Sequence, residues 1–214
     1  MKLERLWVLV FCVAAYASAQ IKSDWPSYNG DYTGKRFSGL TQITPQNVGH
    51  LHAQWVFHAK TPGVLEATPV VINGIMYVTG SNDAFALNAK SGEVLWHYSR
   101  PTSSGLIDDA SGHINRGVAI SGTRLFMETD NAHLLCLDSR SGNLIWDIAY
   151  ASWNKNYGAT GAPLILKDKV LVATSGGDKR HHVRDRFERC ICSERAIGRG
   201  AVALLAAGLE WLDR

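Results

Sequence analysis

The sequence has 214 residues, of which 46% are hydrophobic and 19% charged, and its formal net charge at pH 7 is +3. These proportions are those of an ordinary globular domain with a hydrophobic core. So small a net charge argues against a protein that binds nucleic acid or an anionic membrane through charge alone.

The N-terminus has the pattern of an export signal. A basic start is followed by an apolar run over residues 6–15 and by small residues at 17–19 that fit a cleavage site. The apolar run is too short to span a bilayer, so we predict no transmembrane anchor. We predict a signal peptide over residues 1–19, with a buried N-terminal helix as the alternative.

Residues 20–50 are polar and rich in Gly, Pro and Asn. This composition predicts an irregular lead-in with little regular secondary structure. The segment that follows, 51–57, contains Trp55 and matches the outer strand of a repeat whose first full copies come later in the chain. We therefore place the start of the repeats at residue 51.

A repeat dominates the middle of the chain. Residues 70–96 and 118–146 each contain three short apolar strands, an Asn/Asp-x-x-Ser-Gly turn and a fourth strand that ends in Trp, and a third copy begins at Pro163. A period of about 50 residues with four short strands per copy is typical of a β-propeller blade. We predict an all-β fold, a partial β-propeller of about three four-stranded blades, over residues 51–178.

The turn and the Trp of each repeat have physical reasons. The Asn88 or Asp138 side chain can accept hydrogen bonds from its own backbone ahead, and the Gly takes a positive φ. Trp96 and Trp146 offer a large apolar area, so we expect them to pack between neighbouring blades.

The cysteines of the mature chain do not form a disulfide framework. Cys136 lies in an apolar strand, where a buried, inert thiol is expected. The spacing of Cys190 and Cys192 matches neither a zinc knuckle nor a redox pair.

The lead-in carries motifs that resemble the mature N-terminus of dehydrogenases that depend on pyrroloquinoline quinone (PQQ). The motifs are Asp24-Trp-Pro-Ser-Tyr-Asn-Gly-Asp31, Arg36-Phe-Ser-Gly-Leu40, Ile43-Thr-Pro-Gln-Asn-Val48 and Leu51 with Trp55. They stand in the order and spacing of that family, and the resemblance extends to about residue 178. It implies an eight-bladed propeller and a periplasmic alcohol or sugar dehydrogenase.

The resemblance implies three residues that contact the cofactor. Glu66 matches a glutamate that hydrogen-bonds the quinone, Arg116 matches an arginine that pairs with its carboxylate or quinone oxygens, and Thr160 matches a hydroxyl that bonds it. A guanidinium suits PQQ because it offers a planar fork of donors to carboxylates. Taken singly, they could be a solvated loop charge, a surface ion pair and a packed strand end.

The resemblance also implies a loop against the cofactor ring and a metal ligand. The small residues Ser175, Gly176 and Gly177 match the loop, and Asp178 matches a glutamate that binds Ca²⁺. Because Asp is shorter than Glu by one methylene, it is less suited to bind Ca²⁺ through both carboxylate oxygens. A carboxylate nevertheless remains the ligand that a hard cation prefers. The alternative is an ordinary turn.

The pattern of the repeats stops after Asp178. Residues 179–192 are rich in Arg, His and Cys, and an Ala/Leu run with the look of a helix follows at 200–208. We predict that residues 179–214 are an aberrant tail, the product of a frameshift. A basic binding arm is the alternative, and a signal peptide argues against nucleic acid as its partner.

Together, these observations predict an N-terminal fragment of a periplasmic, PQQ- and calcium-dependent dehydrogenase that oxidises alcohols or sugars and passes electrons to an acceptor such as a cytochrome c. The resemblance places the general base in later blades, so we expect no activity from this chain alone. The alternative function is a non-catalytic propeller scaffold of the cell envelope.

Overall fold

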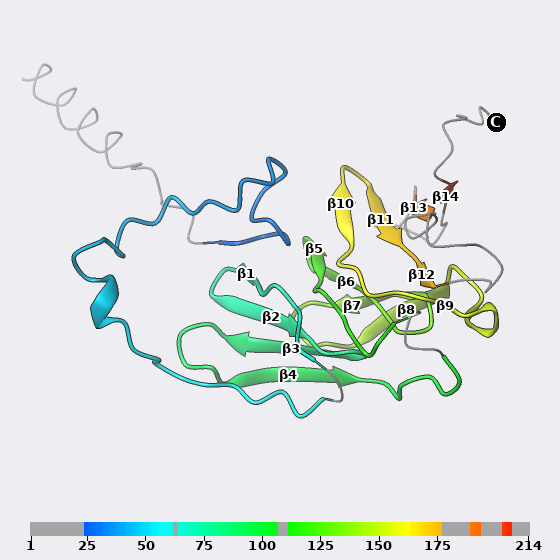
Figure 1. Ribbon diagram of the computed structural model, residues 1–214, viewed down its shortest axis with the longest axis horizontal. Coiled ribbons are helices and arrows are strands. Elements are labelled where there is room, and N and C mark those ends of the chain that lie inside the picture. The colour runs from blue at the N-terminus through cyan, green and yellow to red at the C-terminus, as the bar shows by residue number, and fades with distance from the viewer. Residues whose placement is uncertain (1–23, 62–63, 107–110, 177–188, 194–202, 207–214) are drawn as a thin grey trace, which may run out of the picture. The chain divides into compact units, whose positions relative to one another are not determined.

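The computed structural model describes residues 24–61, 64–106, 111–176, 189–193 and 203–206 (Figure 1). The described residues fall into two compact units. Phe37–Leu51 belong to one unit, which contains the short 3-10 helix η1 (Val48–His50). The other unit comprises Asp24–Arg36 and the described residues from His52 onward, and it holds all the strands.

Three four-stranded antiparallel sheets make up the larger unit (Figure 1). The first sheet consists of β1 (Val70–Ile72), β2 (Ile75–Thr79), β3 (Asp83–Asn88) and β4 (Val94–Ser99). The second consists of β5 (Ala119–Ser121), β6 (Arg124–Glu128), β7 (His133–Asp138) and β8 (Leu144–Ala149). The third consists of β10 (Leu164–Leu166), β11 (Lys169–Ala173), β13 (Arg189–Ser193) and β14 (Ala203–Ala206). A short ladder joins β9 (Tyr157–Gly158) to β12 (Ser175–Gly176), after the 3-10 helix η2 (Trp153–Lys155).

The first two sheets follow the predicted repeat closely. In each, the strands pair in chain order, and the register between the third and fourth strands shifts at the same place, between Ala86 and Leu87 and between Cys136 and Leu137. The prediction of four-stranded blades is thereby confirmed. The exception is the segment around Trp55, which is not a strand in the described part of the chain.

The third sheet takes its last two strands from residues beyond 178. β13 pairs with β11, and β14 pairs with β13. The Ala/Leu run, which we expected to resemble a helix, is a strand at Ala203–Ala206. Pairing with a neighbouring strand satisfies its backbone and outweighs the intrinsic helix preference of Ala and Leu.

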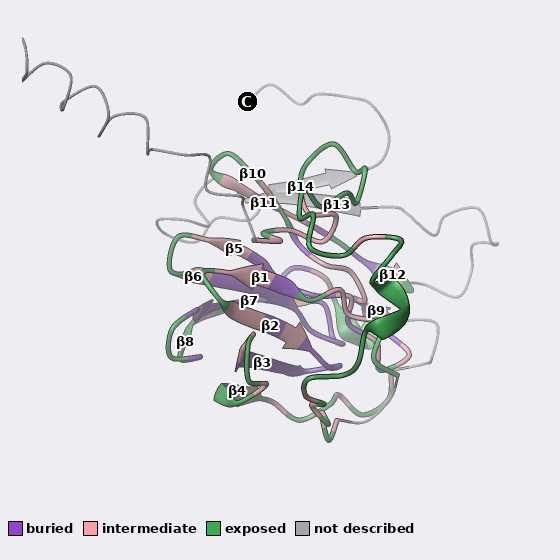
Figure 2. Cartoon of the chain, turned by 90° about the vertical axis from the view of Figure 1, so that its left-hand side faces the viewer, coloured by how far each residue is buried: buried purple, intermediate pink, exposed green. Residues whose placement is uncertain are grey.

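The hydrophobic core lies in two clusters on the two faces of the second sheet. Leu125 and Met127 belong to the cluster shared with the first sheet, whereas Phe126, which lies between them on β6, belongs to the cluster shared with the third. This alternation follows from the two-residue period of a strand. Both faces of the second sheet are therefore covered, and its strands β6 and β7 are largely buried (Figure 2).

Cys136 lies within this core with no exposed surface. Burial raises the pKa of its thiol, so the reactive thiolate is disfavoured. The prediction of a buried thiol is confirmed.

Tryptophan side chains join neighbouring repeats. The Trp96 indole lies over the second sheet's turn at Gly142, and its Nε1 donates to the Ser139 carbonyl oxygen at 2.9 Å. Trp55 lies over Gly92 in the same way, and its Nε1 donates to the Ala89 carbonyl oxygen at 3.3 Å. The expected packing of a Trp between blades is thus present for Trp96, and Trp55 repeats it one blade earlier.

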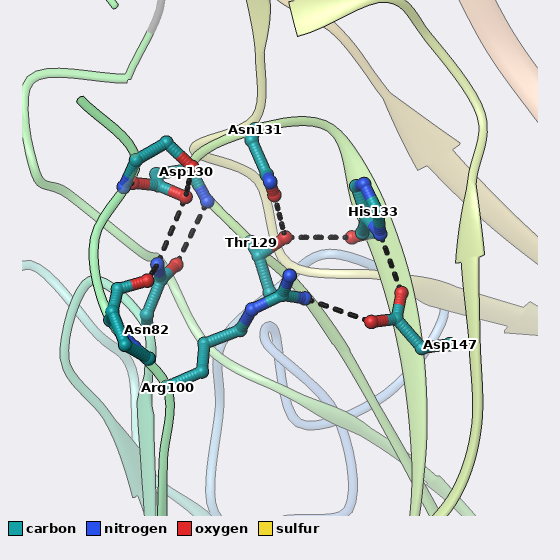
Figure 3. Close-up of polar contacts among 9 residues, drawn as sticks. Asn82, Arg100, Thr129, Asp130, Asn131, His133 and Asp147 are labelled. Atoms are coloured by element: carbon teal, nitrogen blue, oxygen red, sulfur yellow. Dashed lines mark hydrogen bonds and ion pairs between the residues drawn. The ribbon is translucent and has the colours of Figure 1, made fainter. Parts of the chain in front are cut away.

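Polar side chains also join the first and second sheets (Figure 3). Asn82 donates from Nδ2 to Asp130 Oδ1 at 2.9 Å and accepts at Oδ1 from the Asp130 amide at 2.9 Å. The amide of Ser103 donates to Asp130 Oδ2 at 2.6 Å. Because Asn82 and Asp130 are both buried, these bonds hold two turns together where water cannot replace a lost partner.

An aspartate–histidine pair occurs at the same place in both sheets. His97 Nε2 lies 2.8 Å from Asp83 Oδ1 in the first sheet, and His133 Nδ1 lies 2.6 Å from Asp147 Oδ1 in the second. In each case the two residues are diagonal neighbours on adjacent strands. Arg100, after β4, adds an ion pair to Asp147 at 3.1 Å (Figure 3).

Replacing Asn82 with alanine is expected to destabilise the fold by about 2–3 kcal/mol, because the Asp130 amide and carboxylate lose partners at a buried position. Urea unfolding followed by circular dichroism measures the loss. Asn131→Ala is the matched control, since the Asn131 side chain accepts a hydrogen bond from Thr129 within its own turn. Equal losses in the two variants would contradict a special role for the contact between sheets.

Candidate cofactor site

Residues from corresponding places in the three sheets form the candidate site. Glu66, Asn115 and Thr160 each stand four positions before the first residue of β1, β5 and β10, which begin at 70, 119 and 164. Arg116 follows Asn115 directly. Loops that lead into the first strand of each blade lie at one end of the blades, so side chains at these positions can meet although they are far apart in sequence.

Arg116 brings the three loops together. Its Nη2 donates to Glu66 Oε2 at 3.0 Å, and its Nη1 donates to the Thr160 carbonyl oxygen at 3.1 Å. The three residues chosen from the sequence therefore lie in contact. For Thr160, the group that contacts Arg116 is the backbone carbonyl, whereas the family resemblance implies a role for the hydroxyl.

The backbone around Arg116 is held by its two neighbours. Asn115 Nδ2 donates to the Glu128 carbonyl oxygen at 2.8 Å, and Asn115 Oδ1 accepts from the Gly117 amide at 2.8 Å. Gly117 has a φ of +135°, and a Cβ there would lie 3.1 Å from the Thr68 carbonyl oxygen. Glycine is therefore required at 117, because both its φ and this close approach disfavour a side chain.

The ion pair between Arg116 and Glu66 is open to solvent. The two side chains are 40% and 39% exposed, so the pair adds little to stability. The pair matters for ligand binding instead, because it places guanidinium N–H groups beside a carboxylate at an accessible surface. Such a pair can present donors and acceptors to an anionic, oxygen-rich ligand.

The loop that begins at Ser175 lies beside the Thr160 segment. Ser175 pairs with Gly158 and Gly176 pairs with Tyr157 in the ladder of β12 and β9. Ser175 and Gly176, two of the predicted loop residues, thus pair with the strand that leads to Thr160. Gly177 and the predicted calcium ligand Asp178 lie outside the described residues. Within the described ranges, no group of three or more His, Cys, Asp and Glu side chains is placed to hold a metal ion.

Glu128, at the end of β6, is a buried carboxyl that sequence reasoning missed. Its Oε1 accepts a hydrogen bond from the Ala173 amide at 3.2 Å, and its Oε2 has no hydrogen bond of good geometry within the described residues. Burial raises its pKa to about 8, and the Ala173 amide, the Gly161 amide and the Tyr150 hydroxyl offset this only in part. At neutral pH, the Glu128 carboxyl is therefore largely protonated.

Four-stranded antiparallel sheets in chain order, joined through Trp side chains, define part of a β-propeller. The family described as "Glucose/ethanol/alcohol dehydrogenase, beta-propeller domain" matches residues 25–186, and the chain belongs to this family. The matched segment thus extends past residue 178, where we expected the family pattern to stop.

The chain is similar to enzymes of known activity. It is 32% identical over 163 residues to the dehydrogenase subunit of the quinone-type alcohol dehydrogenase of Gluconobacter oxydans, covering 72% of this chain and 22% of that protein. It is 32% identical over 174 residues to the 1-butanol dehydrogenase (cytochrome c) of Thauera butanivorans, covering 79% of this chain and 25% of that one. The chain therefore spans about a quarter of the length of these relatives.

Solved structures give the same result for the fold. A europium-containing methanol dehydrogenase superposes with a TM-score of 0.70 at 30% identity, covering 85% of this chain and 32% of that one. BamB from Moraxella catarrhalis superposes with a TM-score of 0.51 at 16% identity, which speaks for the fold alone. Where residues are described, no helix has the length and apolar character needed to cross a membrane.

Proposed function

We propose that this chain supplies one wall of a PQQ site in a calcium-dependent dehydrogenase that oxidises alcohols or sugars. The observation that carries the proposal is the contact of Arg116 with both Glu66 and Thr160, which joins three loops at an accessible position. The family membership and the alcohol dehydrogenases among the relatives support it.

The donors and acceptors of the wall fit this cofactor. The N–H groups of Arg116 form the fork that carboxylate and quinone oxygens require, and Glu66 beside it can accept a hydrogen bond. Thr160, with the loop over Ser175, Gly176 and Gly177, would border the ring, and Asp178 would contribute a carboxylate oxygen to Ca²⁺. PQQ, when bound, supplies the redox chemistry that side chains lack.

We further propose that the protein acts in the periplasm, directed there by residues 1–19, and that a cytochrome c accepts the electrons. The general base belongs, by the resemblance, to the part of the relatives that this chain does not span. The residues beyond the matched segment, which ends at 186, are proposed to be out of the family's reading frame, and the nucleotide sequence of the gene tests this. A frame shifted by one base that encodes no further propeller repeats would refute it.

The proposed site predicts that Arg116→Ala weakens PQQ binding by roughly tenfold to a hundredfold, because a charge-assisted hydrogen bond is worth about 1.5–3 kcal/mol. Quenching of tryptophan fluorescence by PQQ, with Ca²⁺ present, measures the affinity of the 214-residue chain. No turnover of ethanol or glucose above the blank is expected in a dye-linked assay of the same samples.

Arg140→Ala is the matched control for this measurement. Arg140 also pairs with a carboxylate, Asp138, but it lies on an exposed turn of the second sheet. Its removal should leave PQQ binding unchanged. The proposal fails if the wild-type chain does not bind PQQ, or if the two arginine variants bind it equally well.

A further inference from the structure

The main chain and the side chain of Glu128 contact different segments of the candidate cofactor site, which comprises the loops around Arg116, Thr160 and Ser175. The Glu128 carbonyl oxygen accepts from Asn115 Nδ2 at 2.8 Å, next to Arg116. The carboxyl Oε1 accepts from the Ala173 amide at 3.2 Å, two residues before Ser175. Glu128 thus contacts both the loop before β5, which carries Arg116, and the end of β11, which leads into β12.

The other carboxyl oxygen faces the Thr160 segment. A Cβ on Gly161 would lie 3.1 Å from Glu128 Oε2, so the Gly161 backbone is packed against the carboxyl. Oε2 is fully buried and makes no hydrogen bond of good geometry within the described ranges. Glycine at 161 is what allows the carboxyl to lie this close to the Thr160 segment.

We propose that the Glu128 carboxyl is a positioning group that fixes the Thr160 and Ser175 segments relative to Arg116, so that the three loops form one wall. The proposal rests on the proposed function for the identity of the ligand, and on the contacts of Glu128 for the rest. Glu128 does not reach the accessible surface where Arg116 and Glu66 pair, since it has no exposed area. It acts through the backbone it holds.

The protonation state of Glu128 is expected to control this arrangement. A neutral carboxyl is tolerated in a buried position, whereas an ionised one without partners is not. Tyr150 is the titratable group that acts on it, and its hydroxyl donates to the Ala173 carbonyl oxygen at 3.2 Å. The amides of Ala173 and Gly161 favour the ionised carboxyl, but burial disfavours it by more. Opening of the segments around Glu128, which admits water to the carboxyl, should therefore become easier as the pH rises toward about 8.

Hydrogen–deuterium exchange of the 214-residue chain from pH 6 to pH 9, corrected for the intrinsic exchange rate, tests the proposal. We expect protection over 115–117, 158–161 and 173–176 in the wild type to fall by up to about tenfold per pH unit between pH 6 and about 8, and to level off above that pH. Glu128→Gln, neutral at every pH, should keep its protection across the range. Glu128→Ala should have low protection in these three segments at every pH from 6 to 9.

Met127→Ala is the control for a general loss of packing, because Met127 adjoins Glu128 on β6 but faces the other core cluster. It should lower protection across the second sheet without singling out these three segments. The proposal is overturned if wild type and Glu128→Gln have the same pH profile, or if Glu128→Ala and Met127→Ala have the same exchange pattern.

A PQQ titration of the same variants separates this proposal from the proposed function. If the chain binds PQQ, its affinity should fall above pH 8 in the wild type and stay level in Glu128→Gln. If the exchange results are as expected but PQQ does not bind, the positioning role stands and the assignment of the ligand is wrong.

Discussion

The Glu128→Gln variant should be more stable than the wild type at pH 7.5, and the two should be equally stable near pH 4.5. The pKa of Glu128 is about 8 in the folded chain against 4.5 as the ordinary value. Between these two values the unfolded chain ionises while the folded chain stays protonated. The wild type therefore loses about 1.4 kcal/mol of stability per pH unit, a total of about 4 kcal/mol by pH 7.5, and the amide does not.

Thermal unfolding of both proteins at half-unit pH steps measures this difference, which corresponds to roughly 10 °C in Tm at the upper end. Glu93→Gln removes the same charge from an exposed turn and controls for net charge. Parallel curves for wild type and Glu128→Gln would show that the Glu128 carboxyl is not protonated in the folded chain.

Gly142→Ala should destabilise the chain by about 3 kcal/mol. Gly142 has a φ of +72°, and a Cβ there would lie 2.7 Å from Trp96 Cε3. The left-handed conformation alone costs an L-residue about 1–2 kcal/mol. The remainder comes from displacement of the Trp96 ring and of its Nε1 hydrogen bond to the Ser139 carbonyl oxygen.

Gly122→Ala separates the two contributions. Gly122 has a φ of +58° in the turn between β5 and β6, and no atom lies within 4 Å of where its Cβ would be. Gly122→Ala should therefore lose only the stability that the left-handed backbone conformation costs, about 1–2 kcal/mol. Denaturant unfolding of both variants gives the comparison, and equal losses would mean that the Trp96 contact adds nothing to stability.

The repeats were predictable because their signals are local. Strand alternation, the Asn/Asp-x-x-Ser-Gly turn and the terminal Trp recur within one blade, so 70–96 and 118–146 can be compared by eye. The meeting of Glu66, Arg116 and Thr160 was predictable only through family resemblance, since nothing local joins three loops. The structure adds the contacts of Arg116 that no spacing in the sequence specifies.

Glu128 could not be predicted because its partner is distant. It ends a strand that is buried on both faces, and the amide that bonds it belongs to Ala173, 45 residues further along the chain. A glutamate at a strand end reads as a solvated charge in the sequence. The strand at Ala203–Ala206 was missed for a related reason, because its pairing with β13 is a tertiary contact.

The Asp83–His97 and His133–Asp147 pairs have a consequence for how these repeats are compared. The acid stands on the third strand and the imidazole on the fourth in one sheet, and the two are exchanged in the other. An alignment scored by identity counts two mismatches here, although the contact itself is the same. Propeller repeats should therefore be compared by pairs of contacting positions rather than by single alignment positions, because this reveals similarity between repeats that residue identity misses.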